Sequence, residues 1–176
     1  MTIEHRIATP EDLKSIWNMN IEDNPDEPAW IGWKQEYMEY NHSGKGLTFV
    51  VVCDGRPVGE GTLLFSPDCA PIRGRTQLAD SKTTANINAL RIRKEYEGKD
   101  YISALIRRME NYATAHGYLK ATIGVEADQT RNLGIYLHWG YDRFVMDEKE
   151  GGSLILYYAK PLVSNEDTIW KNNASE

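Results

Sequence analysis

The sequence is poor in residues that stabilise a fold by covalent bonds or by repetition. Its 176 residues include only 2 cysteines and 3 phenylalanines, and its 14 glycines and 7 prolines form no repeat. Disulfide-rich, collagen-like and low-complexity classes are therefore excluded. Hydrophobic residues make up 41% of the chain, more than a disordered protein contains. We expect one domain with its own core, because a domain of ~150 residues buries roughly 68–70% of its unfolded surface.

The sequence also lacks a long hydrophobic run. Its longest apolar stretch, around Phe49–Cys53, has the length of a strand, whereas a membrane-spanning helix needs ~20 apolar residues. No apolar run follows the charges of segment 1–6, so we expect no secretory signal. Cys53 and Cys69 lack the spacing of metal ligands. These features predict a soluble cytoplasmic protein with reduced thiols and no membrane association.

Positive charge is scarce in the chain as a whole but not everywhere. The sequence holds 20 basic and 26 acidic residues, a net charge of -6, which argues against a general nucleic-acid-binding protein. Its four histidines form no i, i+4 pair of the kind that indicates a metal site. Segment 91–108, however, contains six basic and three acidic residues. This local excess of positive charge favours an anionic ligand.

Hydrophobic periodicity predicts the element order β-α-α-β-β-β-α-β-α-β-β. The first helix has Thr9 as its expected N-cap, Pro10 at the first helical position and Asp12 three residues after the cap. A single domain is expected over 1–162, followed by a polar tail over 163–176. Strands are expected at 3–8, 47–53, 57–65, 86–93, 120–126, 143–147 and 153–160, and helices from residue 10, over 29–40, along 102–113 and over 130–139.

Two of these helices have distinctive apolar faces, and one connection is unusually long. Segment 102–113 carries one continuous apolar stripe. The earlier helix places Trp30, Trp33 and Tyr37 at i, i+3 and i+7, a spacing typical of core residues, with an acceptor-pocket lining as the alternative. The polar segment 66–85 is expected to be a loop, and a loop of that length is usually functional or mobile.

Segment 90–103 is the most informative part of the sequence. It consists of a strand end, a charged loop around Gly98 and the first turn of the strongest helix. Such a loop leaves backbone N–H groups free and points the positive end of the helix dipole at whatever lies in front. The arrangement suits a phosphate or pyrophosphate, and the alternative is a solvated helix end.

The element order and this loop together resemble the GNAT superfamily of N-acetyltransferases, which use acetyl-CoA, over residues 3–160. Leu90 and Ile92 match the strand end whose backbone pairs with the pantetheine arm, and Gly98 and Lys99 match the loop that holds the CoA pyrophosphate. The resemblance implies an α/β (α+β) fold with a mixed, mostly antiparallel central sheet flanked by helices. The residues assigned to the cofactor are Leu90, Arg91, Ile92, Glu97, Gly98, Lys99, Asp100, Tyr101, Ile102, Ser103 and Asn132.

The pyrophosphate loop departs from the family pattern and is degenerate. Glu97, Asp100 and Ile102 replace an Arg or Gln, the central Gly and a small residue, and Gln129 and Asn132 depart from the second family signature. Gly at position 100 would allow a positive φ and close approach of the phosphate, and a carboxylate adds repulsion. Aspartate tolerates the left-handed conformation and could also cap the helix. We therefore expect either weaker CoA binding or a GNAT-fold binding protein that has lost efficient CoA use.

The second family signature, from which Gln129 and Asn132 depart, is better preserved in its second half. There Ile135-Tyr136 is followed by Gly140-Tyr141. The resemblance implies direct attack of an amine on the acetyl-CoA thioester, with Tyr136 as the general acid that protonates the sulfur. An ordinary buried helix tyrosine is the alternative role for this residue.

The general base is left open by the sequence. Many members of the family carry Glu on the strand before the loop, where this chain has Asn88. Glu60 and Glu126, charged residues in otherwise apolar strands, are the two candidates. The oxyanion donor would be a backbone N–H group, with that of Ile92 preferred.

The resemblance implies an N-acetyltransferase that acts on a primary amine of a small acceptor. The acidic loop 22–27 favours a cationic acceptor such as an aminoglycoside, a polyamine or a basic peptide end, and a solvated loop is the alternative. No metal, nucleic acid or membrane is expected as a partner. Because members of the family are often dimers, a homodimer is a further hypothesis, in which Ile169 and Trp170 dock on a neighbouring chain.

Overall fold

This computed structural model describes residues 1–163, and they follow the expected element order. The predicted tail, including Ile169 and Trp170, lies outside the described residues except for Val163. A short 3-10 helix, η1, is added before α3. The elements are β1 (Ile3–Ile7), α1 (Pro10–Asp23), α2 (Ala29–Ser43), β2 (Gly46–Cys53), β3 (Arg56–Leu64), β4 (Thr84–Ile92), η1 (Lys94–Tyr96), α3 (Tyr101–Ala115), β5 (Lys120–Glu126), α4 (Thr130–His138), β6 (Arg143–Glu150) and β7 (Ser153–Pro161).

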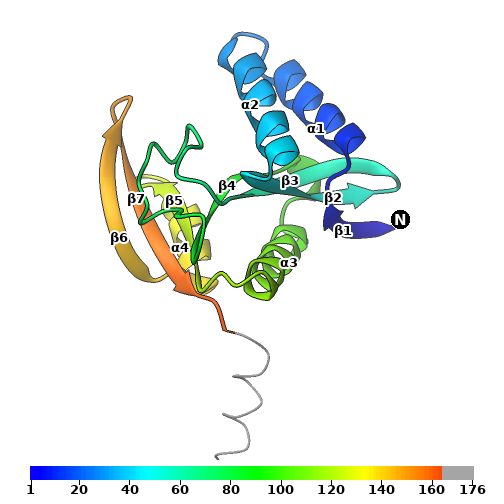
Figure 1. The fold of residues 1–176 in the computed structure, drawn as a ribbon. Coiled ribbons are helices and arrows are strands. Elements are labelled where there is room, and N and C mark those ends of the chain that lie inside the picture. The colour runs from blue at the N-terminus through cyan, green and yellow to red at the C-terminus, as the bar shows by residue number, and fades with distance from the viewer. Residues whose placement is uncertain (164–176) are drawn as a thin grey trace, which may run out of the picture.

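The strands form one seven-stranded sheet in the order β1-β2-β3-β4-β5-β7-β6. Every neighbouring pair is antiparallel except β4 and β5, which are parallel. Helices α1 and α2 cover one face of the first half of the sheet, and α3 covers the other (Figure 1). Helix α4 packs against β5. This mixed, mostly antiparallel sheet flanked by helices confirms the fold class predicted from the sequence.

The sheet opens in its middle, between β4 and β5. The two strands pair only from Thr84–Lys120 to Ile87–Ile123, and a bulge follows on β4. The register with β3 shifts between Glu60 and Thr62, and Ala89 takes a positive φ of 51°. Beyond the bulge the two strands no longer pair, so their ends can line a cleft between the two halves of the sheet.

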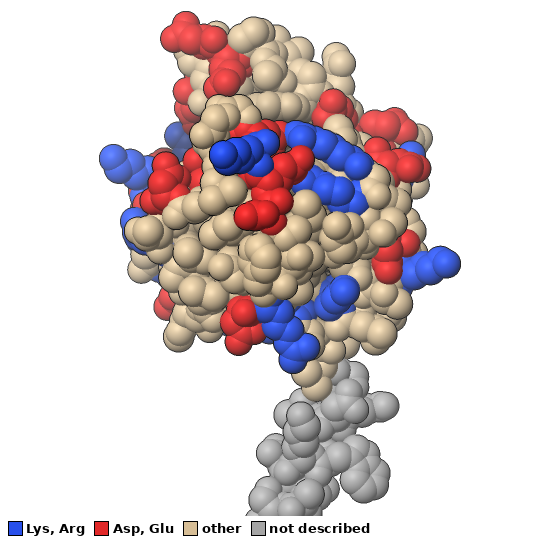
Figure 2. Space-filling view, turned by 90° about the vertical axis from the view of Figure 1, so that its left-hand side faces the viewer, with Lys and Arg blue, Asp and Glu red and all other residues tan. Residues whose placement is uncertain are grey.

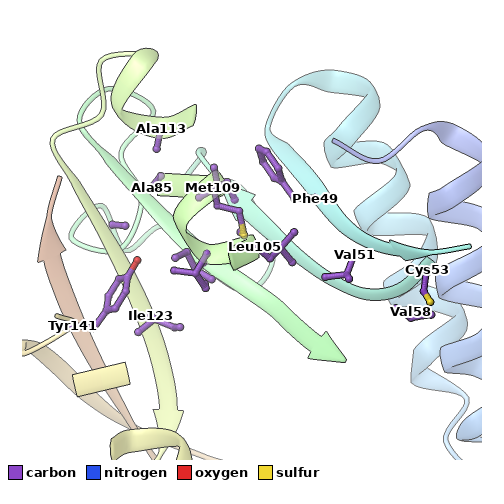
Figure 3. Packing of buried hydrophobic residues seen from close by; sticks show 14 residues of the cluster. Phe49, Val51, Cys53, Val58, Ala85, Leu105, Met109, Ala113, Ile123 and Tyr141 are labelled. Carbon is purple, nitrogen blue, oxygen red and sulfur yellow. The ribbon is translucent and has the colours of Figure 1, made fainter. Parts of the chain in front are cut away.

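The apolar stripe of α3 forms the centre of the core below this cleft. Leu105, Ile106, Met109 and Ala113 are buried, and Figure 3 shows Leu105 and Met109 pointing toward β2, the strand that carries Phe49 and Val51. A Cβ atom at Gly61 would come within 2.9 Å of the Met109 sulfur. The expected helix is confirmed, and it packs directly on the sheet, which fixes the position of its N-terminus.

The structure corrects one strand and one helix face. Strand β6 continues to Glu150 instead of ending at 147, because Gly151 and Gly152, with φ of 55° and 89°, make a two-residue hairpin turn. On α2, Tyr37 is buried and Trp30 is half-buried, but Trp33 is exposed. At about 100° per residue, position 37 falls about 20° from position 30, whereas position 33 falls about 60° away.

The long polar connection after β3 is irregular but anchored. Cys69, Ile72 and Leu78 are buried in it. Arg73 forms ion pairs with Glu148 and Glu150, and Arg75 with Glu148. Figure 2, which views the molecule from the β6 side, shows basic and acidic side chains together on a largely uncharged face. These contacts hold the connection against β6 and β7.

Asp80 stabilises the end of this connection. Its Oδ1 atom accepts hydrogen bonds from the backbone N–H groups of Lys82, Thr83 and Thr84, at 2.8–2.9 Å. Burial alone would raise the pKa of this carboxyl group, but the hydrogen bonds dominate and lower the pKa of Asp80 to about 2. The carboxylate therefore stabilises the turn that leads into β4.

Replacing Asp80 by asparagine should lower the free energy of unfolding at pH 7 by about 1 kcal/mol, because a charged hydrogen-bond acceptor becomes neutral. The carboxyl pKa is lower in the folded chain than in the unfolded chain, where it is about 3.9. Its contribution is therefore complete above about pH 5 and is lost as the pH falls toward 2. Urea unfolding of both proteins should show a difference that shrinks at about pH 2.5, and a difference independent of pH would contradict this role.

Candidate active site

The larger cavity lies in the cleft between β4, α3 and α4 and has a volume of about 690 Å³. Every residue that the sequence analysis assigned to the cofactor lines this cavity, except Lys99. The ammonium group of Lys99 instead lies 5.5 Å from the centre of the Tyr96 ring. The cavity is lined by Leu90, Arg91, Ile92, Tyr96, Glu97, Gly98, Asp100, Tyr101, Ile102, Ser103, Arg131, Asn132, Gly134, Ile135, Tyr136, His138 and Trp139.

The lining residues that sequence reasoning missed come mostly from one face of α4. Arg131, Ile135 and His138 follow one another at four and three positions, a spacing that places side chains on one helix face. That spacing was visible in the sequence and could have extended the prediction from Asn132 and Tyr136 to the rest of this face. Arg131 is exposed and forms no ion pair within residues 1–163.

The loop before α3 has the geometry of an anion-binding turn. Gly98 and Asp100 take positive φ values of 71° and 59°. The N–H groups of Tyr101, Ile102 and Ser103 lie in the first helical turn and find no acceptor in the described part of the chain. These groups and the helix dipole can hold a phosphate or pyrophosphate in the larger cavity.

Asp100 adopts one of the two arrangements considered for it. Its left-handed conformation is confirmed, with φ 59° and ψ 11°. The expectation that it caps the helix is wrong, since its side chain makes no capping hydrogen bond. A residue in the left-handed conformation does not have the extended backbone of a typical N-cap. The loop therefore keeps the shape that glycine would give it and adds a carboxylate at its end.

Tyr136 occupies the junction between the larger cavity and a smaller one, since it lines both. It comes from α4, and its ring packs against Trp139 with 5.7 Å between ring centroids. Its hydroxyl group makes no hydrogen bond within the described residues. Burial raises the pKa of the Tyr136 phenol, so the hydroxyl keeps its proton at neutral pH and can donate it.

The smaller cavity, of about 300 Å³, lies on the other side of the β4 bulge. No lysine or arginine lines it, and its two carboxylates differ in their surroundings. Glu150 is paired with Arg73, whereas Glu126 has no ion-pair partner within residues 1–163. The cavity is lined by Ile87, Asn88, Ala89, Leu90, Ile123, Gly124, Val125, Glu126, Gln129, Tyr136, Glu150, Ile155 and Tyr157.

The two candidate bases differ in burial and in access to the cavities. Glu60 is 0% exposed and lines neither cavity. Its Oε1 atom accepts hydrogen bonds from Arg91 Nε at 2.9 Å and from Asn20 Nδ2 at 2.8 Å. The structure thus brings Glu126, and not Glu60, into a cavity shared with Tyr136.

The backbone of β4 supplies free groups to the cleft. The N–H group of Arg93 donates to the Val58 carbonyl oxygen of β3 at 2.9 Å. Neighbouring residues of a strand point their N–H groups to opposite edges, so the N–H group of Ile92 points away from β3. Ile92 also lines the larger cavity, which places this N–H group on the cleft side.

Comparisons with known proteins agree with this architecture. Solved structures from several organisms share the fold. A GNAT-family acetyltransferase from Desulfovibrio desulfuricans is 11% identical, with a TM-score of 0.72, and the match covers 92% of this chain and 100% of that one. The PaiA N-acetyltransferase from Thermoplasma acidophilum, in complex with coenzyme A, is 18% identical, with a TM-score of 0.60 and coverage of 90% and 99%. A GNAT-family acetyltransferase from Elizabethkingia anophelis, with acetyl-CoA bound, is 14% identical, with a TM-score of 0.58 and coverage of 91% and 98%.

No curated protein matches the sequence, and no helix within residues 1–163 has the length and hydrophobicity needed to cross a membrane. The model of the acetyltransferase (GNAT) family matches residues 11–141, which include both cavities apart from Glu150, Ile155 and Tyr157. This match spans most of the chain, and the fold is the one these acetyltransferases share. The protein belongs to the GNAT family of acetyltransferases.

Proposed function

We propose that this acetyltransferase moves the acetyl group of acetyl-CoA to the primary amine of a small acceptor by direct attack. The observation that carries the proposal is the meeting of two cavities at Leu90 and Tyr136. One cavity offers backbone N–H groups to an anion, and the other offers the unpaired carboxylate of Glu126. A thioester at the junction would face both an amine and a proton donor.

The larger cavity suits CoA in shape and in chemistry. The free N–H groups of Tyr101, Ile102 and Ser103 would hold the pyrophosphate, with Arg131 as an additional cation. The unpaired edge of β4 from Leu90 to Ile92 would bind the pantetheine arm through its backbone. CoA supplies the activated acetyl thioester, and the chain positions it.

Different residues at the junction would accept the proton of the amine and donate a proton to the leaving sulfur. Glu126 would accept a proton from the ammonium form of the acceptor, directly or through water, and free its lone pair. The Ile92 N–H group would donate to the carbonyl oxygen as negative charge develops there. As the new C–N bond forms and the C–S bond breaks, Tyr136 would protonate the sulfur. Cys53 and Cys69 line neither cavity, so no acyl-cysteine is needed in this scheme.

The smaller cavity sets the proposed size and charge of the acceptor. A volume of about 300 Å³ is at the lower end of ligand pockets, so an aminoglycoside could place only one amine-bearing part in it. A primary amine is itself a cation at neutral pH, and Glu126 would attract it. No residue of the acidic loop 22–27 lines either cavity, so that loop gives no support to a multiply charged acceptor.

The direct test is acetyl-CoA-dependent thiol release in the presence of small primary amines. Release that depends on both the amine and the protein supports the proposal, and a panel of amines that yields no release above the rate of spontaneous hydrolysis contradicts it. The family match does not favour the alternative of a binding protein without activity. A cytoplasmic location and a homodimer stay predictions.

The Asp100→Gly variant should bind acetyl-CoA about three- to tenfold more tightly than the natural chain. Glycine adopts φ 59° without steric cost, and the change removes a carboxylate close to the expected pyrophosphate. Asp100→Asn is the matched control, because it removes the charge and keeps a side chain. Calorimetric titration of all three proteins separates the two effects, and equal affinities would show that residue 100 does not face the cofactor.

A further inference from the structure

Four side chains between the α1–α2 pair and the sheet form a contact cluster that the proposed reaction does not use. We call Trp17, Trp30, Glu60 and Arg91 the Arg91 cluster. The guanidinium carbon of Arg91 lies 5.0 Å from the centre of the Trp17 ring and 4.8 Å from that of Trp30. The two rings lie 6.1 Å apart, and Arg91 Nε donates to Glu60 Oε1 at 2.9 Å.

This cluster holds all the buried side-chain polar atoms that lack a hydrogen-bond partner within residues 1–163: Trp17 Nε1, Trp30 Nε1, Glu60 Oε2 and Arg91 Nη2. Most buried polar atoms in folded proteins are paired, so their concentration in one place is unusual. Glu60 Oε2 and Arg91 Nη2 belong to the same ion pair and can complement each other. The two indole N–H groups remain, which leaves a surplus of donors over acceptors.

The side chain of Arg91 is held in one orientation, but within residues 1–163 not all of its N–H groups have a hydrogen-bond acceptor. Glu60, with an exposed fraction of 0%, holds its Nε atom, and the two indole rings pack against its guanidinium group. A third of the Arg91 side chain, 33%, remains exposed. Within residues 1–163 its Nη1 atom has no hydrogen-bond partner, and it is absent from the buried unpaired atoms, so it is open to a ligand. A guanidinium fork held in this way matches the geometry of a carboxylate.

The position of Arg91 connects the cluster to the reacting groups. Arg91 lines the larger cavity, and the residues on either side of it are Leu90, which lines both cavities, and Ile92, the proposed oxyanion donor. The side chain of Leu90 packs toward α3, near Gly61 and Met109, whereas that of Arg91 lies toward α1 and α2. An anionic group on Arg91 would therefore sit on the α1–α2 side, within reach of an amine at the junction.

We propose that Arg91 binds a carboxylate of the acceptor, so that the acceptor class is an amino carboxylate, such as an amino acid, and not a simple amine. This inference rests on the proposed function. Because Glu60 already neutralises Arg91, the carboxylate is recognised through directed hydrogen bonds more than through excess charge. In a zwitterionic acceptor, Glu126 would then bind the ammonium group and Arg91 the carboxylate.

The first test compares matched acceptors on the natural protein. An amino acid, its amide and its decarboxylated amine share one side chain and differ at the carboxylate. Thiol release should give a kcat/KM at least about tenfold higher for the amino acid, as expected for hydrogen bonds between charged groups. An amide or decarboxylated amine that is used equally well overturns the inference.

Variants assign the preference to Arg91. The Arg91→Lys change keeps a positive charge beside Glu60 but removes the fork, and it should reduce the preference for the carboxylate severalfold. Removing the charge of Arg91 alone would leave Glu60 buried and unpaired, which could unfold the protein. The second variant therefore neutralises both residues, as Glu60→Gln/Arg91→Met. It should abolish the preference for the carboxylate. Arg93→Lys, at a residue that lines neither cavity, is the control and should keep it. A preference unchanged in both Arg91 variants overturns the assignment.

A binding measurement separates this inference from the proposed chemistry. N-acetylated products have no titrating amine, so calorimetry of the CoA-saturated protein with an N-acetyl amino acid and its amide isolates the carboxylate. Tighter binding of the acid without any thiol release supports the Arg91 site and contradicts the reaction. Thiol release with equal binding of both products supports the reaction and overturns the Arg91 site.

Discussion

Replacing Tyr136 by phenylalanine is expected to lower kcat about 10²-fold and to leave the affinity for acetyl-CoA nearly unchanged. The change removes one hydroxyl group at the junction of the two cavities, where no other phenol lines both. Without a proton donor the sulfur must leave as a thiolate, which raises the barrier to C–S cleavage. Because the ring remains, its packing against Trp139 and the shape of both cavities should persist.

The measurement is steady-state thiol release together with calorimetry of acetyl-CoA binding. Tyr118→Phe is the matched control, since Tyr118 stacks on Phe65, lines neither cavity and also has a raised phenol pKa through burial. Because burial raises the pKa of Tyr136, loss of its proton should not limit the rate below about pH 10. Unchanged turnover in Tyr136→Phe would remove this residue as the acid.

Replacing Glu126 by glutamine is expected to lower kcat about 10²-fold near pH 7. The amide preserves the size of the side chain but cannot accept the proton of an ammonium group. The defect should diminish as the pH rises, because more of the acceptor is then already deprotonated in solution. A pH profile of kcat/KM for the natural and variant proteins measures this directly.

Two further variants make the Glu126 test specific. Glu150→Gln changes the other carboxylate of the same cavity, which is already paired with Arg73, and should have a much smaller effect on kcat. Glu60→Gln should change folding or acceptor preference more than the pH profile. If Glu60→Gln reproduced the pH-dependent defect while Glu126→Gln retained full turnover, the base would have to be Glu60.

Local features of the fold could be predicted because they depend on neighbouring residues. The N-cap of α1 forms as expected, with Thr9 and Asp12 in a reciprocal capping box and Pro10 in the first turn. The apolar stripe of α3 also appears at its predicted position. Each of these features is determined by interactions within a few residues, which a single sequence displays.

Features that depend on sheet geometry could not be predicted in the same way. The choice between Glu60 and Glu126 depends on how deeply each side chain is buried, on the partners it finds and on where β4 separates from β5. The bulge at Ala89 follows the last residue of β4 that pairs with β5, and alanine gives no sequence signal for a positive φ. The place of Lys99 in the loop predicts a contact with the cofactor, but its side chain lies toward Tyr96.

The loop before α3 has one feature that the sequence predicts and one that depends on backbone geometry. Its placement next to a strand end and a helix N-terminus followed from the order of residues 90–103. Whether Asp100 would distort it depended on backbone conformation, and the left-handed φ of 59° shows that the glycine-like shape is retained. The effect of the Asp100 carboxylate on the affinity for a bound phosphate is an interaction energy, which the Asp100→Gly and Asp100→Asn variants measure.

Calorimetric titration of the natural protein with acetyl-CoA, in the absence of any acceptor, tests the central claim most directly. The free N–H groups at the start of α3 and the 690 Å³ cavity predict saturable binding of one molecule per chain, with a Kd below about 1 mM and competition by CoA. Absence of binding by both the natural chain and Asp100→Gly at millimolar acetyl-CoA would contradict the claim that this cavity holds the cofactor.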